Sequence, residues 1–354
     1  MSRRSGSPSG VRVPGANRGE GRSPRVGRRE QGSDPRPEAR YPGNTPAGGK
    51  PIASGARHAY PWVCMSTCVG TAYASAWSAW ALARWRRRLQ VLFLLLLNGY
   101  LPGWAALTLF AGRSKGICLP VLNCSSCPGA FLSCPLGAWQ GYLGAYRSPS
   151  FFVGGILLLA GSSLGRFFCG WLCPFGACQD LLSSWARRRF IPWSSHLRLL
   201  AYAVLFITFL LPYWSPTGTP YFCKYLCSAG QLFAGLPLVL GRPEFRSLVG
   251  WVFLLKVAVL LVIFLLVLIG ISRVFCRTLC PLGAWLGLFN RVSLWRMRFY
   301  PDLCRRCHSC RAACPMGVKL PDEVNSSACI RCLSCTEVCS TGALRFGLIK
   351  KGKE

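Results

Sequence analysis

The chain has 354 residues, of which 51% are hydrophobic and only 15% are charged, and it contains 13 tryptophans. The apolar residues occur in long blocks, which favours a protein with several membrane-crossing segments and argues against a soluble globular one. The formal net charge of +31 comes from 42 Lys and Arg against 11 Asp and Glu. Such an excess of positive charge is typical of proteins that bind nucleic acid or anionic lipid, and of cytoplasmic loops of membrane proteins. The positions of the charges distinguish these explanations.

The N-terminal stretch is basic and lacks apolar periodicity. Residues 1 to about 60 are rich in Gly, Pro, Ser and Arg and would bury too little surface to offset chain entropy. We expect residues 1–84 to be a disordered basic region. No apolar segment follows its arginines as in a signal peptide, and no aromatic residues interleave, so we expect no nucleic acid partner. Translation from Met65 is an alternative start.

Four apolar segments follow, and each can cross a hydrocarbon core of about 30 Å. They cover residues 89–111, 151–168, 197–214 and 249–272. We therefore expect a mainly α-helical transmembrane domain at residues 85–295 with about four membrane-spanning helices. Arginine clusters at 84–88, 187–189 and 273–298 fall on one side of such a domain. Because cytoplasmic flanks collect Lys and Arg, both chain ends are predicted to be cytoplasmic.

Two residues within these segments are polar. Asn98 is expected to bond across helices. Lys256 lies near the start of the fourth segment, where it either reaches back to the membrane surface or marks a quinone or proton route.

The apolar part also looks duplicated. RFFCGWLCPFGACQDLL at 166–182 aligns with RVFCRTLCPLGAWLGLF at 273–289, and both contain Cys-x3-Cys-Pro. The outer loops carry NCSSCPGAFLSCPLGAW at 123–139 and YFCKYLCSAG at 221–230. The unit is thus a span, an outer cysteine motif, a second span and an inner cysteine motif, used twice. Such repeats often place a functional site at their interface.

The motif cysteines have three possible roles: a further metal or cluster, redox-active thiols, or small buried residues. The inner set comprises Cys169, Cys173, Cys276 and Cys280, which are predicted to meet on the cytoplasmic side. The outer set comprises Cys124, Cys127, Cys134, Cys223 and Cys227. The isolated cysteines, interpreted as free or buried thiols, are Cys64, Cys68, Cys118 and Cys178.

The tail contains the most specific pattern. CRRCHSCRAACP at 304–315 and CIRCLSCTEVCS at 329–340 both read Cys-x2-Cys-x2-Cys-x3-Cys. This is the two-cluster ferredoxin arrangement, in which the fourth cysteine of each run binds the other [4Fe–4S] cluster. Zinc sites usually separate two cysteine pairs by a longer loop, which argues against zinc. Residues 296–354 are therefore predicted to form a small α+β domain with two [4Fe–4S] clusters.

The spacing assigns the ligands of both clusters. The first cluster is predicted to be held by Cys304, Cys307, Cys310 and Cys339. The second is predicted to be held by Cys329, Cys332, Cys335 and Cys314. His308 is interpreted as a solvated loop residue and not as a ligand. Ser340 replaces the usual proline, which shapes a turn and binds no metal, so a small effect is expected.

The stretches GWLCPFGACQDLL, CKYLCSAGQLFAGLP and FCRTLCPLGAWLGLFN, followed by the paired cysteine runs, resemble the polytopic 4Fe–4S binding membrane proteins. These are related to the quinol dehydrogenase membrane subunit of periplasmic nitrate reductase (NapH type), the nitrous oxide reductase regulator (NosR type) and the cytochrome oxidase accessory protein. The resemblance covers residues 89 to 346 approximately. It implies a multi-pass protein of the cytoplasmic or inner membrane, with electron flow between quinol or a cytoplasmic donor and an extracytoplasmic acceptor.

Two departures from the family pattern stand out. Ser228 occupies a position that is usually proline, which leaves the role of Cys223 and Cys227 open. No flavin-binding domain precedes the spans.

The leading hypothesis is a membrane electron-transfer component, either of the quinol dehydrogenase type or working with a redox protein partner. The bilayer core of about 30 Å is too thick for one efficient electron hop from the far side, which favours a relay. An accessory factor that reduces or delivers a metal to a respiratory enzyme is the alternative. A redox-sensing regulator is a third class.

Overall fold

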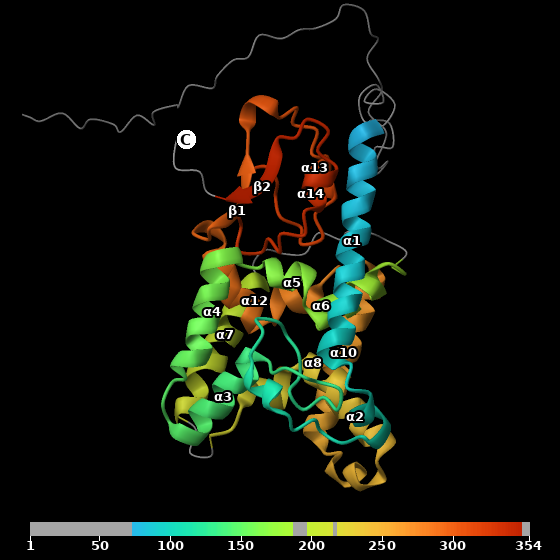
Figure 1. Ribbon diagram of the computed structural model, residues 1–354, viewed down its shortest axis with the longest axis vertical. Coiled ribbons are helices and arrows are strands. Elements are labelled where there is room, and N and C mark those ends of the chain that lie inside the picture. Colours follow the sequence, from blue (N-terminus) through green and yellow to red (C-terminus); the bar gives the residue numbers. More distant parts are fainter. Residues whose placement is uncertain (1–72, 187–196, 215–217, 349–354) are drawn as a thin grey trace, which may run out of the picture. The chain divides into compact units, whose positions relative to one another are not determined.

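The computed structural model describes residues 73–186, 197–214 and 218–348 (Figure 1). Most of the N-terminal region that we expected to be disordered lies outside these ranges, as do Cys64, Met65 and Cys68. Residues 73–84 are a correction, because they form the first part of a helix. This stretch, YASAWSAWALAR, contains five alanines, and alanine is the strongest helix former.

The apolar part is built of long helices joined by short ones. The longer helices are α1 (Tyr73–Asn98), α3 (Pro135–Tyr146), α4 (Phe151–Leu164), α7 (Arg198–Trp214) and α10 (Trp251–Ile269). The short helices and turns are α2 (Leu101–Ala106), η2 (Arg113–Gly116), α5 (Phe167–Trp171), α6 (Pro174–Ser183), η4 (Phe222–Leu226), α8 (Ser228–Gly230), η5 (Gln231–Gly235), α9 (Leu236–Gly241), η6 (Pro243–Leu248), α11 (Val274–Thr278), α12 (Pro281–Leu288) and η7 (Phe289–Arg291). The inner cysteine motifs fall in the short helices α5, α6, α11 and α12.

Of the helices that the structure describes, α10 is the one long and apolar enough to cross a membrane. The expected second and third spans form helices of 14 and 17 residues. The expected first span is divided, since α1 ends at Asn98 and α2 begins at Leu101. The side chain of Asn98 donates to the carbonyl of Leu94 in its own helix and does not donate across helices.

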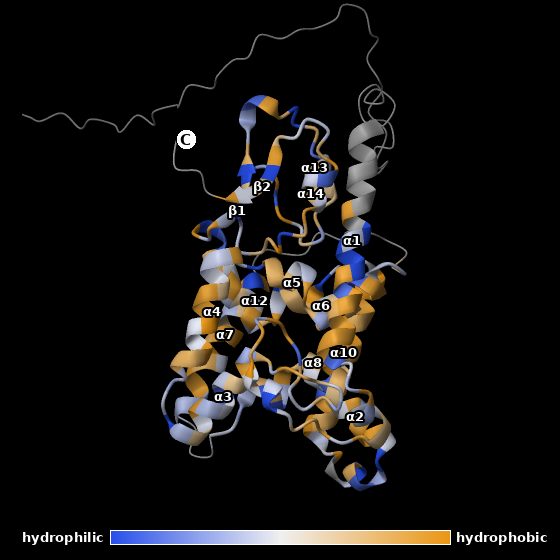
Figure 2. Ribbon diagram, in the orientation of Figure 1, coloured by the Kyte–Doolittle hydropathy of each residue, from blue (hydrophilic) through white to orange (hydrophobic). Residues whose placement is uncertain are grey.

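Apolar side chains cover the outside of these helices. Figure 2 shows hydrophobic residues concentrated on α4, α7 and α10. Only 17% of the apolar stretch that makes up α10 is buried, and Leu254, Leu261 and Leu265 on that helix are exposed. The core helix of a soluble protein would be mostly buried, so this surface requires an apolar neighbour.

The duplication is visible in the packing. α5 and α6 carry the first inner motif, and α11 and α12 carry the second. α12 packs against α7 and α4, while α10 packs against α6 and α11. Figure 1 shows α5, α6 and α12 between the tail and the helices α3 and α8 of the outer motifs.

The tail is a small α+β unit, as predicted. Its strands β1 (Trp295–Phe299) and β2 (Leu344–Leu348) pair antiparallel, with Met297 opposite Phe346. Between the strands lie the turn η8 (Pro301–Leu303) and two single-turn helices, α13 (Ser309–Ala312) and α14 (Ser334–Glu337), and α14 packs on α1. A unit with so few helical and strand residues needs a further source of folding stability, such as bound metal.

Candidate metal centres

The eight cysteines of the tail form two groups. Within each group the thiols lie close enough to influence one another electrostatically. The first group comprises Cys304, Cys307, Cys310 and Cys339. The second comprises Cys314, Cys329, Cys332 and Cys335. Each group takes its fourth thiol from the end of the other run, and the groups adjoin where Cys335 interacts with Cys310. The structure brings together the sets that the spacing predicts, and their role as ligands stays a prediction.

Both cysteine runs have the same unusual backbone around their second cysteine. Arg306 and His308 flank Cys307 in one run, and their φ angles are 51° and 56°. In the other run Arg331 and Leu333 have φ angles of 52° and 62°. Residues other than glycine rarely adopt these values. Left-handed residues of this kind turn N–H groups inward, as in the backbone concavities that bind Fe–S clusters and other anions.

The second group surrounds a cavity. All four of its cysteines line this cavity together with apolar side chains. Burial raises the pKa of Cys329 to about 12, so the thiol holds its proton until a metal displaces it. Four thiols around an apolar cavity have the chemistry that a [4Fe–4S] cluster needs.

The spacing of the thiols distinguishes clusters from single ions. Among the described residues, no three His, Cys, Asp or Glu side chains converge closely enough to hold one metal ion. A tetrahedral zinc ion with bonds of about 2.3 Å would hold its thiolates roughly 3.8 Å apart. A cubane presents a separate iron to each thiolate, so its ligands stand farther apart.

The four cysteines of the inner motifs lie together. Cys280 interacts with Cys169, Cys173 and Cys276, and all four side chains are buried. Two come from the α5–α6 repeat and two from the α11–α12 repeat. The predicted meeting of the repeats is thus present in the structure, and metal binding at this inner group stays a prediction.

The last cysteine of each motif caps a helix. The four N-cap residues are Cys134 of α3, Cys173 of α6, Cys227 of α8 and Cys280 of α12. The N–H groups of Gly230 and Gly283 donate to the Sγ atoms of Cys227 and Cys280 at 3.3 Å. The side chains of Cys134 and Cys173 accept no such capping hydrogen bond. An N–H group that donates to sulfur stabilises the thiolate.

Ser228 does not disturb this geometry. It takes the first position of α8, where the other three helices have proline. Cys227 before it still accepts from Gly230. The departure from the family pattern therefore leaves the backbone around Cys227 intact.

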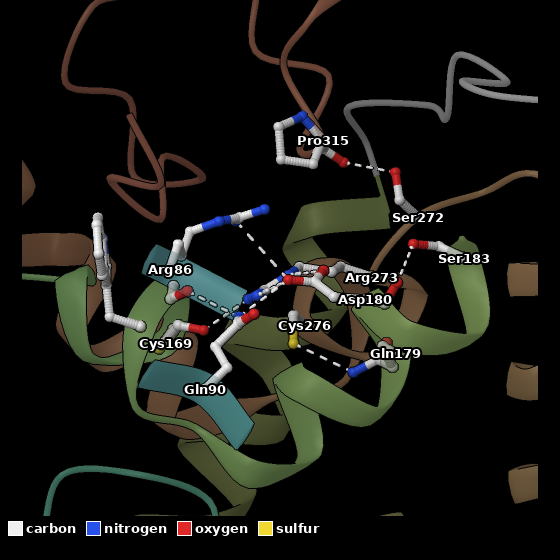
Figure 3. A network of polar contacts seen from close by, with 12 residues as sticks. Arg86, Gln90, Cys169, Gln179, Asp180, Ser183, Ser272, Arg273, Cys276 and Pro315 are labelled. Atoms are coloured by element: carbon white, nitrogen blue, oxygen red, sulfur yellow. Dashed lines mark hydrogen bonds and ion pairs between the residues drawn. The ribbon is translucent and has the colours of Figure 1, made fainter. Parts of the chain in front are cut away.

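A buried ion pair that the sequence analysis missed joins the two repeats (Figure 3). Arg273 donates to both carboxylate oxygens of Asp180, at 2.7 and 2.6 Å, and to the carbonyl of Cys169 at 2.6 Å. Burial alone would raise the pKa of Asp180, but Arg273 and Arg86 lower it below its ordinary value. One signal pointed to this residue. Asp180 is the single acid between Glu38 and Glu244 in a strongly basic chain.

The same network reaches α1. Gln90 donates to Asp180 at 3.0 Å and to the carbonyl of Gly170 at 2.9 Å (Figure 3). Its side chain is buried. α1 is thereby fixed to α5 and α6, which carry the first inner motif.

The inner motif touches the tail directly. Gly170, next to Cys169, lies so close to the tail that a Cβ atom there would be 2.4 Å from the Ile330 carbonyl oxygen and 3.7 Å from the Cys332 Cα. The indole of Trp171 donates to the carbonyl of Arg331 at 3.0 Å. The inner thiols and the second thiol group of the tail are therefore joined by a packed backbone contact.

Arg331 anchors this contact from the tail side. Its buried guanidinium donates to the carbonyls of Leu164 and Asn290, at 2.7 and 2.8 Å, and to that of Trp295. The side chain of Asn290 donates in turn to the carbonyl of Cys329 at 2.8 Å. Burial lowers the pKa of Arg331 to about 10, a cost that these carbonyls offset.

The outer cysteines gather too. Cys227 interacts with Cys124, Cys134 and Cys223, and Cys127 interacts with Cys124. Lys256 donates to the carbonyl of Cys223 at 3.3 Å. Its ammonium group therefore binds within the protein instead of reaching back to the surface.

Comparison with known protein families agrees with this arrangement. Residues 145–192, 199–242 and 247–299 match the model of a 4Fe–4S binding domain. Residues 296–340 match that of a 4Fe–4S dicluster domain. No solved structure gives a significant match.

Several proteins resemble the chain. An uncharacterized protein of Methanocaldococcus jannaschii is 30% identical over 192 residues, which are 52% of this chain and 72% of that protein. YccM of Escherichia coli, whose name marks it as a candidate electron transport protein, is 25% identical over 77% of this chain and 78% of its own length. The ferredoxin-type protein NapH of Haemophilus influenzae is 30% identical over 54% of this chain and 66% of its own length. The chain therefore belongs to the family of ferredoxin-type 4Fe–4S binding proteins related to NapH, NosR and YccM.

Proposed function

We propose that this protein is a multi-pass membrane component that carries electrons between the quinone pool and the two [4Fe–4S] clusters of its cytoplasmic tail, with a further cluster at the inner group. The observation that carries the proposal is the direct contact between the inner cysteine motif and the tail, at Gly170 and Cys332. Bound [4Fe–4S] clusters supply one-electron oxidation and reduction. The chain holds their thiols, buries those of the inner group and fixes the order of the groups.

The exposed apolar surface supports a membrane location. An exposed helix like α10 would not be tolerated in water. The 17 residues of α7 span about 26 Å at roughly 1.5 Å per residue, close to the bilayer core. We assign the four crossings to α1 with α2, to α4, to α7 and to α10. The arginine clusters then place both chain ends and the tail in the cytoplasm.

A pocket beside the tail suits a quinone headgroup. This pocket has a volume of about 360 Å³, within the usual range for small-molecule sites. Leu94 and Gln90 of α1 line it with Asp180, and so does Ser334, the neighbour of Cys335. The lining combines apolar side chains with polar and charged ones, and a quinone headgroup uses both kinds. The position next to a cysteine of the tail keeps the electron path short.

The alternative of metal delivery has less support. A delivery site has to bind and release its ion where a partner protein can reach it. The buried inner thiols also lack the exposure that transfer to a partner needs. Electron transfer uses buried centres without difficulty.

The test uses the full-length protein, purified without oxygen and placed in lipid nanodiscs. Iron and acid-labile sulfide are counted first, and about eight of each are expected from the tail and about twelve with the inner group. A reduced quinol is then added, and the bleaching of the cluster absorbance is followed. Iron that remains oxidised with quinol, although dithionite reduces it, would contradict the quinone assignment.

The pocket offers a matched pair of variants. Leu94→Trp fills the pocket, so we expect quinol to reduce the clusters at least about tenfold more slowly at unchanged iron content. Leu92→Trp is the control, since Leu92 lies on the same helix with an exposed side chain. Equal slowing in both variants would place the quinol elsewhere.

A further inference from the structure

Four of the five outer cysteines form a second thiol group, in which Cys134 and Cys227 are buried and Cys124 and Cys223 are half-buried. Cys223 interacts with Cys134 and Cys124, and Cys227 interacts with all three. A Cβ atom on Gly230 would lie 3.5 Å from the sulfurs of both Cys124 and Cys227, so these sulfurs are at most twice that distance apart. A Cβ on Gly137 would lie 3.9 Å from the sulfur of Cys223. Two glycines thus leave open space among the thiols.

This outer group repeats the construction of the inner group. In the inner group, Gln179 accepts from the N–H of Phe275 at 3.3 Å, and Phe275 precedes Cys276. In the outer group, Gln140 accepts from the N–H of Phe222 at 3.2 Å, and Phe222 precedes Cys223.

The spacing to the N-cap cysteines is the same in both groups. Gln179 follows Cys173 by six residues, and Gln140 follows Cys134 by six. Cys134, Cys223 and Cys227 therefore correspond to Cys173, Cys276 and Cys280. Cys124 supplies the fourth thiol, as Cys169 does in the inner group.

A cation lies beside each group at the same place. Arg166 donates to the carbonyl of Cys276 at 2.8 Å. Lys256 donates to the carbonyl of the corresponding Cys223 at 3.3 Å. A positive charge favours the reduced, more negative form of a nearby redox centre.

Buried polar groups around the outer thiols point to a missing ligand. The hydroxyl of Ser228 and the side-chain amide of Asn123 have no hydrogen-bond partner, although both residues are at most 2% exposed. Both are chain neighbours of cysteines in the group, namely Cys227 and Cys124. Unpartnered buried polar groups are costly, and a bound cluster with its sulfides would accept such hydrogen bonds.

One short segment links the two groups. The backbone N–H of Leu122 lies beside the thiol of Cys173 in the inner group. The next N–H, that of Asn123, lies beside the thiol of Cys134 in the outer group. Both residues are buried. Two adjacent peptide groups thus connect the inner thiols with the outer ones.

We propose that Cys124, Cys134, Cys223 and Cys227 bind a further [4Fe–4S] cluster, which exchanges single electrons with the inner group and with a one-electron redox protein at the outer face. Each exchange oxidises one centre by one electron and reduces the other by one, and no proton or bond is involved. Cys127 is not a ligand. The inference extends the proposed function, because it carries electrons from the cytoplasmic tail to the opposite side of the membrane.

The test compares iron content and electron paramagnetic resonance spectra of the full-length protein and three variants. Cys134→Ser with Cys227→Ser is expected to lose about four irons per chain and one reduced-cluster signal, and to keep the tail signals. Cys127→Ser, the matched control, is expected to lose none. Cys173→Ser with Cys280→Ser is expected to lose the inner signal instead. An outer pair variant with the iron content of the wild type overturns the inference, as does iron loss in Cys127→Ser.

The result is separable from the proposed function. Absence of tail signals in the wild type would refute the proposed function, whereas an unchanged outer variant with intact tail signals would refute this inference alone. Zinc or copper in place of iron at the outer group would refute it as well.

A second variant avoids the risk that loss of two cysteines prevents folding. Lys256→Met removes the charge beside Cys223 and leaves all cysteines in place. We expect an unchanged iron content and a lower midpoint potential for one signal, the one that the outer pair variant lacks. A lysine that serves only to fix the backbone would leave every midpoint where it is in the wild type.

Discussion

The side chain of Asp180 connects three parts of the chain through hydrogen bonds. Its carboxylate receives two hydrogen bonds from Arg273, whose guanidinium is fully buried, and one from Gln90. The three residues belong to three different helices or helix junctions. A single charge therefore ties α1 to both halves of the duplicated domain.

Asp180→Asn leaves Arg273 buried without its counter-charge, and breaking such a pair costs about 3–5 kcal/mol. We expect a clearly lower midpoint of thermal unfolding in detergent. Glu244→Gln, which breaks the exposed pair with Arg242, is the control, and its effect should stay below about 1 kcal/mol. Equal effects would mean that the buried pair adds nothing.

The pH dependence of the same pair follows from its charges. Burial raises the pKa of Asp180, but Arg273 and Arg86 outweigh it and hold the pKa below 3.8. The stabilisation is therefore complete above a pH of about 4 and is lost only as the pH falls below that value. The difference between wild type and Asp180→Asn should accordingly be the same at about pH 6 and pH 8.

The sequence predicted the cysteine groups of this protein well and the ends of its helices less well. The two cysteine runs specify the tail groups because their spacing is short and rigid, and the Cys-x3-Cys-Pro motifs placed the inner thiols together. The ends of the helices were harder to predict than the cysteine groups. The long apolar run from residue 89 hides the break after Asn98, which the sequence marks only by Gly99 and Pro102. Contacts such as that of Arg331 with three distant carbonyls have no local signal at all.

The third cysteine motif allows a test at the level of a helix start. Ser228 is buried with an unpartnered hydroxyl, and Cys227 before it has the extended backbone that precedes proline in the other three motifs. Ser228→Pro should thus be neutral or stabilise the protein by about 0.4–1 kcal/mol. Thermal unfolding at full iron content measures this. A marked destabilisation would show that the backbone of α8 differs from that of its counterparts.

Across the whole molecule, the tail and the apolar helices form a continuous structure. Hydrogen bonds from Trp171, Asn290 and Arg331 cross the junction in both directions. Ser272 at the end of α10 adds another, to the carbonyl of Pro315 at 2.9 Å. The clusters of the tail are thereby set at fixed positions relative to the inner motif.

Gly170→Ala tests this junction. The added methyl group would meet the backbone of Ile330, which cannot move aside as a side chain can, and overpacking of this kind costs about 1–3 kcal/mol. We expect slower electron exchange between the inner group and the tail at unchanged iron content. Gly141→Ala is the control, because nothing lies within 4 Å of its Cβ position. Identical rates in both variants would argue against a path through this contact.

The packed junction at Gly170 also determines what has to move during turnover. Many redox proteins ferry electrons on a domain that swings between docking sites, and their rates fall as the solvent becomes more viscous. Here the tail has no free linker at the junction and is held by buried hydrogen bonds. Under the proposed function the protein would act as a fixed conductor in which only electrons travel, so glycerol or sucrose should leave its internal electron exchange unchanged and slow only the encounters with its partners.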